Sequence, residues 1–184
     1  MGEDKALLRL EGRSLLDIVC HRLLGITPHV FVVGSRAQFG AEAIEDIFQN
    51  RGPLGGIHAA LATGHAELSL VLAVDLPFVE EKFLQHLVRE AQALDTVVTV
   101  PRTADGWQPL CAVYRQSFLS PAEEALRAGR NKIDALFDRV QLRMIDEDAL
   151  RDAGFRPQMF DNLNTPEDLA RARKRLQKGA LSSS

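Results

Sequence analysis

Apolar runs of strand length alternate with helical patterns along this chain, and this alternation is the feature that most restricts its fold. Strands are predicted over 29–34, 41–47, 68–75, 96–100, 109–114 and 140–146. Helices are predicted between them, over 54–63, 78–93, 117–128 and about 132–138. Continuous apolar strands separated by helices are typical of a mostly parallel sheet covered on both faces. The sequence therefore predicts a three-layer α/β fold.

The first and last predicted helices are marked by their end residues. Ser14 is a good N-cap residue, Asp17 completes a capping box, and Gly25 can end the helix in the left-handed conformation. The last helix begins at Thr165, with Pro166 at its first position. Acidic side chains in its first turn and basic ones toward its end match the helix dipole.

Composition indicates one globular domain with room for a core. The chain has 184 residues, of which 46% are hydrophobic, and a formal net charge of −3. We expect one domain over residues 1–178 and a disordered tail over 179–184. Apolar runs such as 68–76 are too short to span a bilayer, and no secretory signal is visible, so we expect a cytoplasmic protein without membrane contact. The mild acidity argues against nucleic acid as a partner.

The cysteines and histidines give no sign of a transition-metal site. Cys20 and Cys111 lie far apart between apolar neighbours, which favours reduced core residues over a disulfide or a metal site. The five histidines show no pairing at metal-ligand spacing. Zinc-dependent hydrolysis and a histidine-based relay therefore have no basis in the sequence.

Asp75 is the first candidate functional residue. It ends the apolar stretch in "LVLAVDLPF", and Pro77 helps to end the strand and fix the turn. Ligands of open parallel sheets bind beyond the carboxyl ends of the strands. A single carboxylate there suits Mg²⁺, which fills its other positions with phosphate oxygens and water. The alternative is an Asp that caps the following helix, and the sequence alone favours neither.

A glycine-rich turn precedes the predicted helix over 54–63. In "NRGPLGGIHAAL", Gly52, Gly55 and Gly56 surround Pro53, and glycines there let a ligand approach free backbone N–H groups. Taken alone this signal is weak, because a Gly-Pro turn before a helix usually serves only as a turn. Asp46 lies upstream, where it could reach the same crevice.

Six motifs, in order, resemble one known family. They are "MGEDKALL", "IED" followed by "GPLGGI", "AVDLPF", "WQPLCAVY", "AGRNKI" and "FDNLNTPEDL". Together they are similar to the molybdenum cofactor guanylyltransferases, and the resemblance covers essentially the whole chain. It implies a Rossmann-like nucleotidyltransferase fold. It also implies transfer of GMP from GTP to the terminal phosphate of molybdenum cofactor, with release of pyrophosphate.

The resemblance assigns roles on the nucleotide side to three residues. Lys5 would hold the nucleotide phosphates, Asp46 would contact the GTP nucleoside, and Asp75 would hold Mg²⁺ beside the α-phosphate. Lys5 and Asp75 are thus the expected catalytic residues. The chemistry agrees, because a substrate phosphate is the nucleophile and the enzyme needs only to position two polyanions and neutralise charge.

The pterin side of the expected site comes from the later motifs. Lys132 falls where the family has a basic residue, and Asn162 and Asn164 match two asparagines ahead of the last helix. Gln108 and these asparagines have the donors and acceptors that a pterin ring needs. Without the resemblance, turn and cap chemistry is the better interpretation. Proteins of cofactor synthesis and of delivery to molybdoenzymes are further possible partners.

The opening "MGEDK" matches the end of a longer signature in this family. That signature is a first strand and a loop of the form L-A-G-G-x-S-x-R, whose N–H groups hold the nucleotide. The expectation is a start assigned at an internal methionine or an N-terminus outside this numbering, since a sheet without a central strand exposes unpaired edges. A real loss would leave a non-catalytic carrier of the cofactor.

Two departures bear on base specificity. Gly34 stands where some members carry an asparagine that contacts the nucleotide. The feature that distinguishes GTP from CTP lies in the loop ahead of "MGEDK", so a molybdopterin cytidylyltransferase is the second hypothesis for an enzyme. The preference for GTP rests on "GPLGGI" and "NLNTPEDL".

Overall fold

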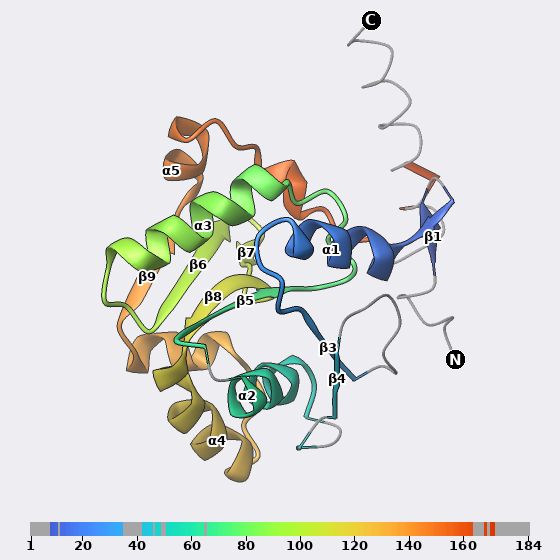
Figure 1. Cartoon of the computed structure of the whole chain (residues 1–184). Helices are drawn as coiled ribbons and strands as arrows, with labels where there is room; N and C mark the ends of the chain where they lie inside the picture. The colour runs from blue at the N-terminus through green and yellow to red at the C-terminus, as the bar shows by residue number, and fades with distance from the viewer. Residues whose placement is uncertain are drawn as a thin grey trace, which may run out of the picture.

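A computed structural model describes residues 8–10, 12–34, 42–45, 47–48, 51–64, 66–163, 168, 170 and 171. The largest sheet has five strands: β5 (Leu68–Leu72), β6 (Val98–Thr103), β7 (Gly106–Trp107), β8 (Cys111–Arg115) and β9 (Leu142–Ile145). They lie in the order β5-β8-β6-β7, with β9 paired along β6 (Figure 1). Strands β5, β6 and β9 share one direction, and β8 runs against them.

The sheet is therefore mixed, where the sequence analysis expected mostly parallel pairing. Parallel pairing holds for β6 with β9, whereas β8 is antiparallel to both of its neighbours. The reason is the short connection, since parallel strands need a crossover of a dozen or more residues. The predicted strands over 96–100 and 109–114 leave only eight residues between them. The chain instead turns back through β7 and inserts β8 between β5 and β6.

Two smaller pairs of strands lie beside this sheet. Strands β3 (Phe31–Val33) and β4 (Glu42–Ile44) are parallel, in the register Val32 opposite Ala43. Both were predicted, although β3 is shorter than the range 29–34. Strands β1 (Arg9–Leu10) and β2 (Arg13–Ser14) form a short antiparallel hairpin that the sequence analysis missed.

The helices follow the predicted positions closely. They are α1 (Leu15–Leu24), α2 (Pro53–Thr63), α3 (Glu81–Ala93), α4 (Leu119–Arg127) and the short α5 (Glu147–Asp152), which the sequence analysis missed. Three 3₁₀ segments, Gln116–Phe118, Asp134–Arg139 and Pro157–Phe160, complete the described elements. Of the predicted last helix, residues 168, 170 and 171 are described and helical, while the tail over 179–184 lies outside the described residues.

Helix α1 has the N-terminus that its sequence predicts. The Ser14 hydroxyl accepts the Asp17 N–H at 3.0 Å, which satisfies one of the N–H groups that a first turn leaves open. Gly25, however, has a φ of −70°. The left-handed ending predicted for this residue is therefore wrong. A right-handed turn closes the helix instead, with the Gly25 and Ile26 N–H groups donating to the carbonyls of His21 and Leu23.

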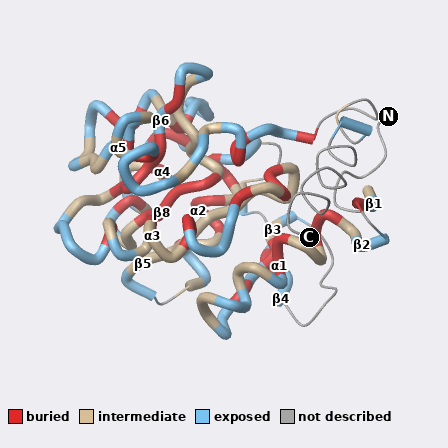
Figure 2. The backbone as a smooth tube through the Cα atoms, turned by 90° about the horizontal axis from the view of Figure 1, so that it is seen from above, coloured by how far each residue is buried: buried red, intermediate tan, exposed pale blue. Residues whose placement is uncertain are grey.

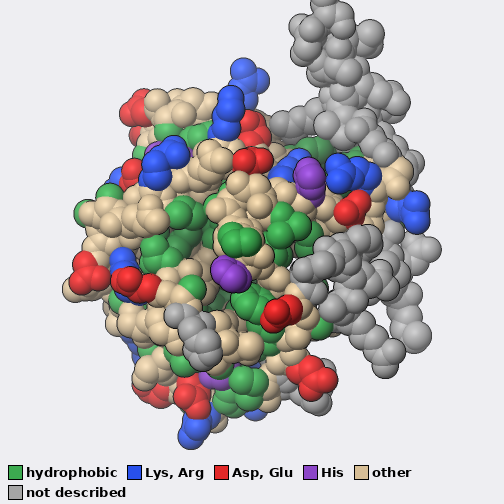
Figure 3. All heavy atoms as spheres, in the orientation of Figure 1, with side chains coloured by type: hydrophobic (Ala, Val, Ile, Leu, Met, Phe, Trp, Pro, Cys, Tyr) green, Lys and Arg blue, Asp and Glu red, His purple; other side chains and the backbone are tan. Residues whose placement is uncertain are grey.

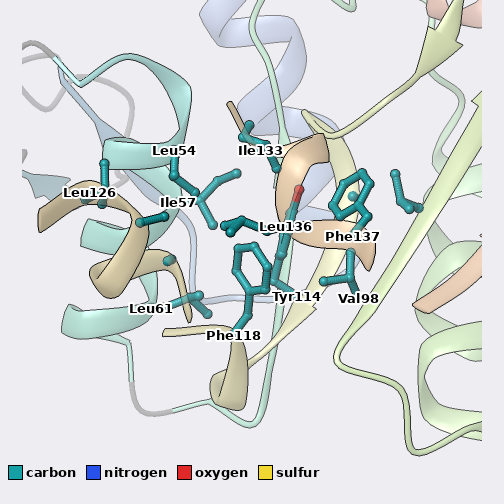
Figure 4. Close-up of a cluster of buried hydrophobic side chains, with 14 residues drawn as sticks. Leu54, Ile57, Leu61, Val98, Tyr114, Phe118, Leu126, Ile133, Leu136 and Phe137 are labelled. Atoms are coloured by element: carbon teal, nitrogen blue, oxygen red, sulfur yellow. The ribbon is translucent and has the colours of Figure 1, made fainter. Parts of the chain in front are cut away.

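Helices cover the five-stranded sheet on both faces, so the expected α/β layering is confirmed. Because side chains alternate along a strand, β8 sends Ala112 and Tyr114 to one face and Cys111 and Val113 to the other. The first face packs against α2, α4 and the 3₁₀ segment Asp134–Arg139 (Figure 4). The second packs against α3, α5 and the last 3₁₀ segment. Figure 2 shows the buried backbone concentrated along these strands and the helix sides that face them.

Candidate functional site at the carboxyl end of β5

Asp75 lies in a turn that follows β5. The strand ends at Leu72, and the Leu76 N–H donates to the Ala73 carbonyl at 3.2 Å. Leu76 and Pro77 are buried, whereas Asp75 is half-buried. The following helix α3 begins at Glu81, with Glu80 at the N-cap position and no side-chain cap bond. Glu80, and not Asp75, therefore occupies the N-cap position of α3.

Arg22 of α1 holds the far side of this turn. Its guanidinium donates to the Pro77 carbonyl, although the two residues are 55 positions apart in the sequence. Burial lowers the pKa of Arg22, and the nearby Glu80 carboxylate partly offsets this effect. A charged donor to a backbone carbonyl is among the stronger hydrogen bonds in proteins. Arg22 therefore fixes the turn that carries Asp75.

Gln108 lies in the turn before β8, and this turn meets the end of β5. The Ala73 N–H donates to the Leu110 carbonyl at 2.8 Å, which joins the two segments directly. The Gln108 side-chain amide donates to the Thr103 hydroxyl at 3.3 Å. Its backbone also serves the turn, because the Gln108 N–H donates to the Pro101 carbonyl at 2.9 Å. Turn chemistry is thus one established role of Gln108.

Tyr114 supports the same turn from inside the core. Its hydroxyl donates to the Pro109 carbonyl at 2.7 Å, and its side chain is fully buried. Burial raises the pKa of Tyr114, with a smaller contribution from Cys111. The hydroxyl therefore stays protonated and remains a donor to the turn that carries Gln108.

Asn162 lies next to Asp75 through a backbone contact. The N–H of the following residue, Leu163, donates to the Asp75 carbonyl at 3.0 Å. Asn162 itself is exposed, while Leu163 is buried against Leu10 and Leu15. Three segments that are distant in sequence, carrying Asp75, Gln108 and Asn162, therefore converge at the carboxyl end of β5.

Lys132 lies in the segment between α4 and the 3₁₀ segment Asp134–Arg139. Its ammonium pairs with the Asp134 carboxylate at 3.2 Å, and 78% of its side chain is exposed. The neighbouring Ile133 belongs to the same cluster as Trp107, whose ring lies 5.1 Å from that of Phe137. Lys132 therefore precedes a residue of the cluster that also contains Trp107, the neighbour of Gln108 in the sequence. No contact joins its side chain to Asp75 within the described part of the chain.

One of the glycines at the start of α2 has a clear structural role. Gly52 has a φ of +63°, which side chains rarely adopt, and it precedes Pro53 at the first helical position. A Cβ added at Gly56 would lie 3.5 Å from the Val33 side chain, which is an ordinary van der Waals contact, so packing does not require glycine there. Lys5, Asp46 and Asn164 lie outside the described residues, and their assigned roles stay predictions.

Asp75 is the described residue to which the family motifs assign a metal, and this role stays a prediction. Among the described residues, no group of three or more His, Cys, Asp and Glu side chains could hold a metal ion. Cys20 and Cys111 are both free and buried, as predicted. The half-exposed Asp75 carboxylate offers a hard oxygen donor, and Mg²⁺ needs one or two such donors when substrate phosphates supply the rest.

Comparisons with known proteins give the relatives of this chain. Residues 1–144 match the family model described as MobA-like NTP transferase domain. The chain is 32% identical to a probable molybdenum cofactor guanylyltransferase from Pelotomaculum thermopropionicum, over 94% of this chain and 85% of that protein. The chain belongs to the MobA-like nucleotidyltransferase family. It is also 31% identical to the molybdenum cofactor guanylyltransferase of Desulfosudis oleivorans, over 98% of this chain and 91% of that protein.

Solved structures give the same result for the fold of this family member. The molybdopterin-guanine dinucleotide biosynthesis protein A of Archaeoglobus fulgidus superposes with a TM-score of 0.80 at 30% identity, over 96% of this chain and 92% of that one. A 2-C-methyl-D-erythritol 4-phosphate cytidylyltransferase from Thermus thermophilus has a TM-score of 0.70 at 17% identity, over 94% of each chain. The nucleotidyltransferase fold expected from the motifs is therefore confirmed.

Two supporting residues of this nucleotidyltransferase were missed by the sequence analysis. Arg22 supports a turn that is far away in the sequence, and Tyr114 supports the turn that precedes its own strand. "WQPLCAVY" contains Tyr114 but gives no sign that its hydroxyl reaches back to Pro109. The sequence offered no local signal for Arg22, because its partner is a backbone carbonyl that any residue at position 77 provides. Such contacts appear only when the chain is folded.

Proposed function

We propose that this chain transfers GMP from GTP to the terminal phosphate of molybdenum cofactor, giving molybdopterin guanine dinucleotide and pyrophosphate. The convergence of Asp75, Gln108 and Asn162 at the end of β5 carries this proposal. The names of the curated relatives and of the Archaeoglobus structure support it. A sheet edge where several strand-following segments meet is the usual ligand site of an open α/β fold.

On the nucleotide side, Asp75 would hold Mg²⁺. The ion would neutralise charge at the reacting phosphate of GTP. Lys5 binds the nucleotide phosphates and Asp46 contacts the nucleoside, as the family motifs imply. The turn held by Arg22 keeps the Asp75 carboxylate in place, so that little reorganisation is needed when both substrates are bound.

On the cofactor side, Gln108, Asn162 and Asn164 recognise the pterin, and Lys132 contacts its phosphate. The ion pair between Lys132 and Asp134 is exposed, and such pairs contribute only about 0–1 kcal/mol. Lys132 can therefore exchange Asp134 for a substrate phosphate at little cost. A lysine serves this purpose as a flexible point charge.

The reaction needs no nucleophile from the protein. An oxygen of the terminal phosphate of molybdenum cofactor attacks the α-phosphorus of GTP. The bond between the α-phosphorus and the bridging oxygen breaks, and pyrophosphate leaves with that oxygen. The role of the protein is to align the two phosphates and to offset their charge.

The reaction belongs in the cytoplasm, where thiols such as Cys20 and Cys111 stay reduced. Delivery proteins for molybdoenzymes are its expected partners.

The first test measures nucleotide binding by isothermal titration with GTP and then CTP, in the presence of Mg²⁺. It uses the 184-residue chain and a version extended upstream by the first strand and loop of the family signature. The proposal requires that the extended form binds and prefers GTP. A preference for CTP would change the assigned base and favour a cytidylyltransferase. If neither form binds a nucleotide, while molybdenum cofactor binds, the chain is a carrier of the cofactor and the proposed transfer is wrong.

The second test separates the two halves of the site. Asp75→Asn should lower Mg²⁺-dependent transfer by about 100-fold or more without changing the fold. The matched control is Asp105→Asn, which removes an exposed carboxylate at the turn between β6 and β7. Near-normal turnover of Asp75→Asn would contradict the metal role.

Lys132→Ala should raise the KM for molybdenum cofactor by about 10-fold and leave the KM for GTP nearly unchanged.

A further inference from the structure

The hairpin formed by β6 and β7 holds an exposed cation over the only tryptophan of the chain. Arg102 of β6 pairs with Trp107 of β7, and its guanidinium carbon lies 4.9 Å from the centre of the Trp107 ring. The Trp107 ring also packs against the ring of Phe137, with 5.1 Å between the two ring centres. A guanidinium at this distance is attracted to the electron-rich face of an indole ring. Arg102 is therefore held in one place, although its side chain is exposed.

The charge of Arg102 is not neutralised by a neighbour. Among the described residues, none forms an ion pair with its guanidinium or accepts a hydrogen bond from it. Arg115, Arg143 and Arg151, by contrast, each pair with an acidic side chain. A guanidinium carries its N–H donors in a planar fork that fits two oxygens of one anion. The contact with Trp107 uses the face of this group and leaves the donors in its plane for a ligand.

Two polar contacts fix the hairpin that carries Arg102. At the tip, the Ala104 N–H donates to the Glu147 carboxylate of α5 at 2.7 Å. At the base, the Gln108 side-chain amide donates to the Thr103 hydroxyl at 3.3 Å. A side chain on a restrained hairpin needs little reorganisation when a ligand binds. Arg102 is thus presented in a prepared position, and its neighbour in the sequence binds Gln108 of the proposed site.

Arg102 lies on the same face of the sheet as the segment of Lys132. Side chains alternate along a strand, so Arg102 follows Val100, which packs in the cluster on the face of α2 and α4. Trp107 packs against that cluster, and Ile133 is one of its buried members. Lys132 precedes Ile133 in the sequence. The two cations therefore border one apolar cluster, on one side of the sheet.

A phosphate on this side of the site depends on individual cations. Figure 3 shows acidic and basic side chains mixed on the face that presents α1, α2 and α3, and the formal net charge of the chain is −3. A general positive field, which would attract any polyanion, is therefore not what binds the substrate. The fork of Arg102 fits a phosphate or a carboxylate, and the proposed reaction brings a phosphate to the cofactor side of the site.

We propose that Arg102 binds the terminal phosphate of molybdenum cofactor through two parallel N–H···O hydrogen bonds, while Trp107 holds the guanidinium in position. The identity of this phosphate rests on the proposed function. Lys132 adds a flexible point charge to the same phosphate, whereas the fork of Arg102 fixes its rotation. An oxygen of this phosphate is the attacking atom of the proposed transfer, so its orientation affects the rate as well as the affinity.

The first experiment measures how much the phosphate adds to binding. Hydroxymethylpterin phosphate, and the same pterin without its phosphate, are titrated calorimetrically into the 184-residue chain. The wild-type protein should bind the phosphate form about 100-fold more tightly, and Arg102→Met should lower this ratio to about tenfold, because Lys132 remains. Arg102→Lys should give a ratio between the two, since it keeps the charge and loses the fork. The matched control is Arg89→Met, which changes an exposed arginine on α3 and should leave the ratio unchanged.

Two results of this titration contradict the proposal. One is an unchanged ratio in Arg102→Met. The other is a wild-type protein that binds the two pterins equally or binds neither of them.

Trp107 gives a second and independent signal. It is the only tryptophan in the sequence, so the tryptophan emission of the chain comes from the ring beside Arg102. Inorganic phosphate should change this emission saturably in the wild-type protein, with sodium chloride at the same ionic strength as the control. Arg102→Met should lose the phosphate-dependent change. The same change in Arg102→Met, or no change in the wild-type protein, would show that phosphate does not bind at Arg102 and would overturn the proposal.

Steady-state kinetics separate a failure of this inference from a failure of the proposed function. Arg102→Met should raise the KM for molybdenum cofactor by about tenfold and lower kcat several-fold, with a nearly unchanged KM for GTP. Wild-type kinetic constants in Arg102→Met would refute the role of Arg102 and leave the proposed GMP transfer intact. A wild-type protein that shows the expected titration but no transfer would refute the proposed function and support Arg102 as a residue that binds a pterin phosphate.

Discussion

Replacing Tyr114 with phenylalanine tests the link between the buried core and the turn that carries Gln108. The hydroxyl of Tyr114 donates to the Pro109 carbonyl at 2.7 Å, while the ring packs 4.9 Å from that of Phe118. Tyr114→Phe removes the hydrogen bond and keeps the ring. The variant therefore isolates one polar contact in a fully buried position.

The expected loss follows from the burial of this contact. An intramolecular hydrogen bond contributes about 0.5–1.5 kcal/mol net, and leaving a buried partner unsatisfied costs about 1–3 kcal/mol. Pro109 is half-buried, so water can reach its carbonyl in part. We expect Tyr114→Phe to lower the free energy of unfolding by about 1–2 kcal/mol. In a domain of this size that lowers Tm by about 2–8 °C.

Urea unfolding measures the change in stability, and steady-state kinetics measure its effect on the site. Without this hydrogen bond, the turn should hold Gln108 less firmly against molybdenum cofactor. A loss of about 0.7 kcal/mol in the binding free energy of the cofactor raises its KM about threefold, so we expect an increase of about threefold or more. The control is Phe118→Leu, which removes apolar volume from the same cluster and has no bond to the turn. It should lower Tm with an unchanged KM. An unchanged Tm and KM in Tyr114→Phe would refute the reasoning.

The remaining predictions concern alkaline pH and the turn of Asp75. Burial raises the pKa values of Cys111 and Tyr114 above their ordinary values of 9.0 and 10.0. Their contributions are complete below those values. The free energy of unfolding should fall above pH 9 by about 1.4 kcal/mol per pH unit for Cys111, and Tyr114 should add a fall of the same size above pH 10. Urea unfolding between about pH 8 and about pH 11 measures this slope. Cys111→Ala should make its first part shallower without removing it, because burial also raises the pKa of Cys20. Arg22→Met should raise the KM for GTP several-fold in steady-state assays, because the Pro77 carbonyl loses its donor, while the exposed Arg89→Met on α3 should have no effect.

Local signals in the sequence were enough for most of the elements. The Ser14 cap and the apolar pattern after it predicted α1. The strand predicted over 96–100 overlaps the first three residues of β6 (Val98–Thr103). These signals depend on neighbours within one turn of helix or one strand. The hairpin β1–β2 was missed because its strands have two residues each and no apolar run.

Interactions over long distances in sequence were not predictable in the same way. The insertion of β8 between β5 and β6 depends on which edges are open when the chain folds, although the eight-residue connection was a signal that excluded parallel pairing. The candidate site was found through Asp75, Gln108 and Asn162 as separate motifs. Their meeting point appeared only with the bonds between Ala73 and Leu110 and between Asp75 and Leu163.

The sequence by itself therefore determined the α/β class, the positions of most of the helices and the family, and it predicted the candidate site residues. Each of these depends on local periodicity or on motifs that are read along the chain. The tertiary structure decided the direction of β8 and the support of two turns by Arg22 and Tyr114. The physical reason is that hydrogen bonds to backbone carbonyls, and the pairing of strand edges, depend on where the residues lie in the fold. Every residue has a backbone carbonyl, so the side chain of the partner residue gives no sign of such a bond in the sequence.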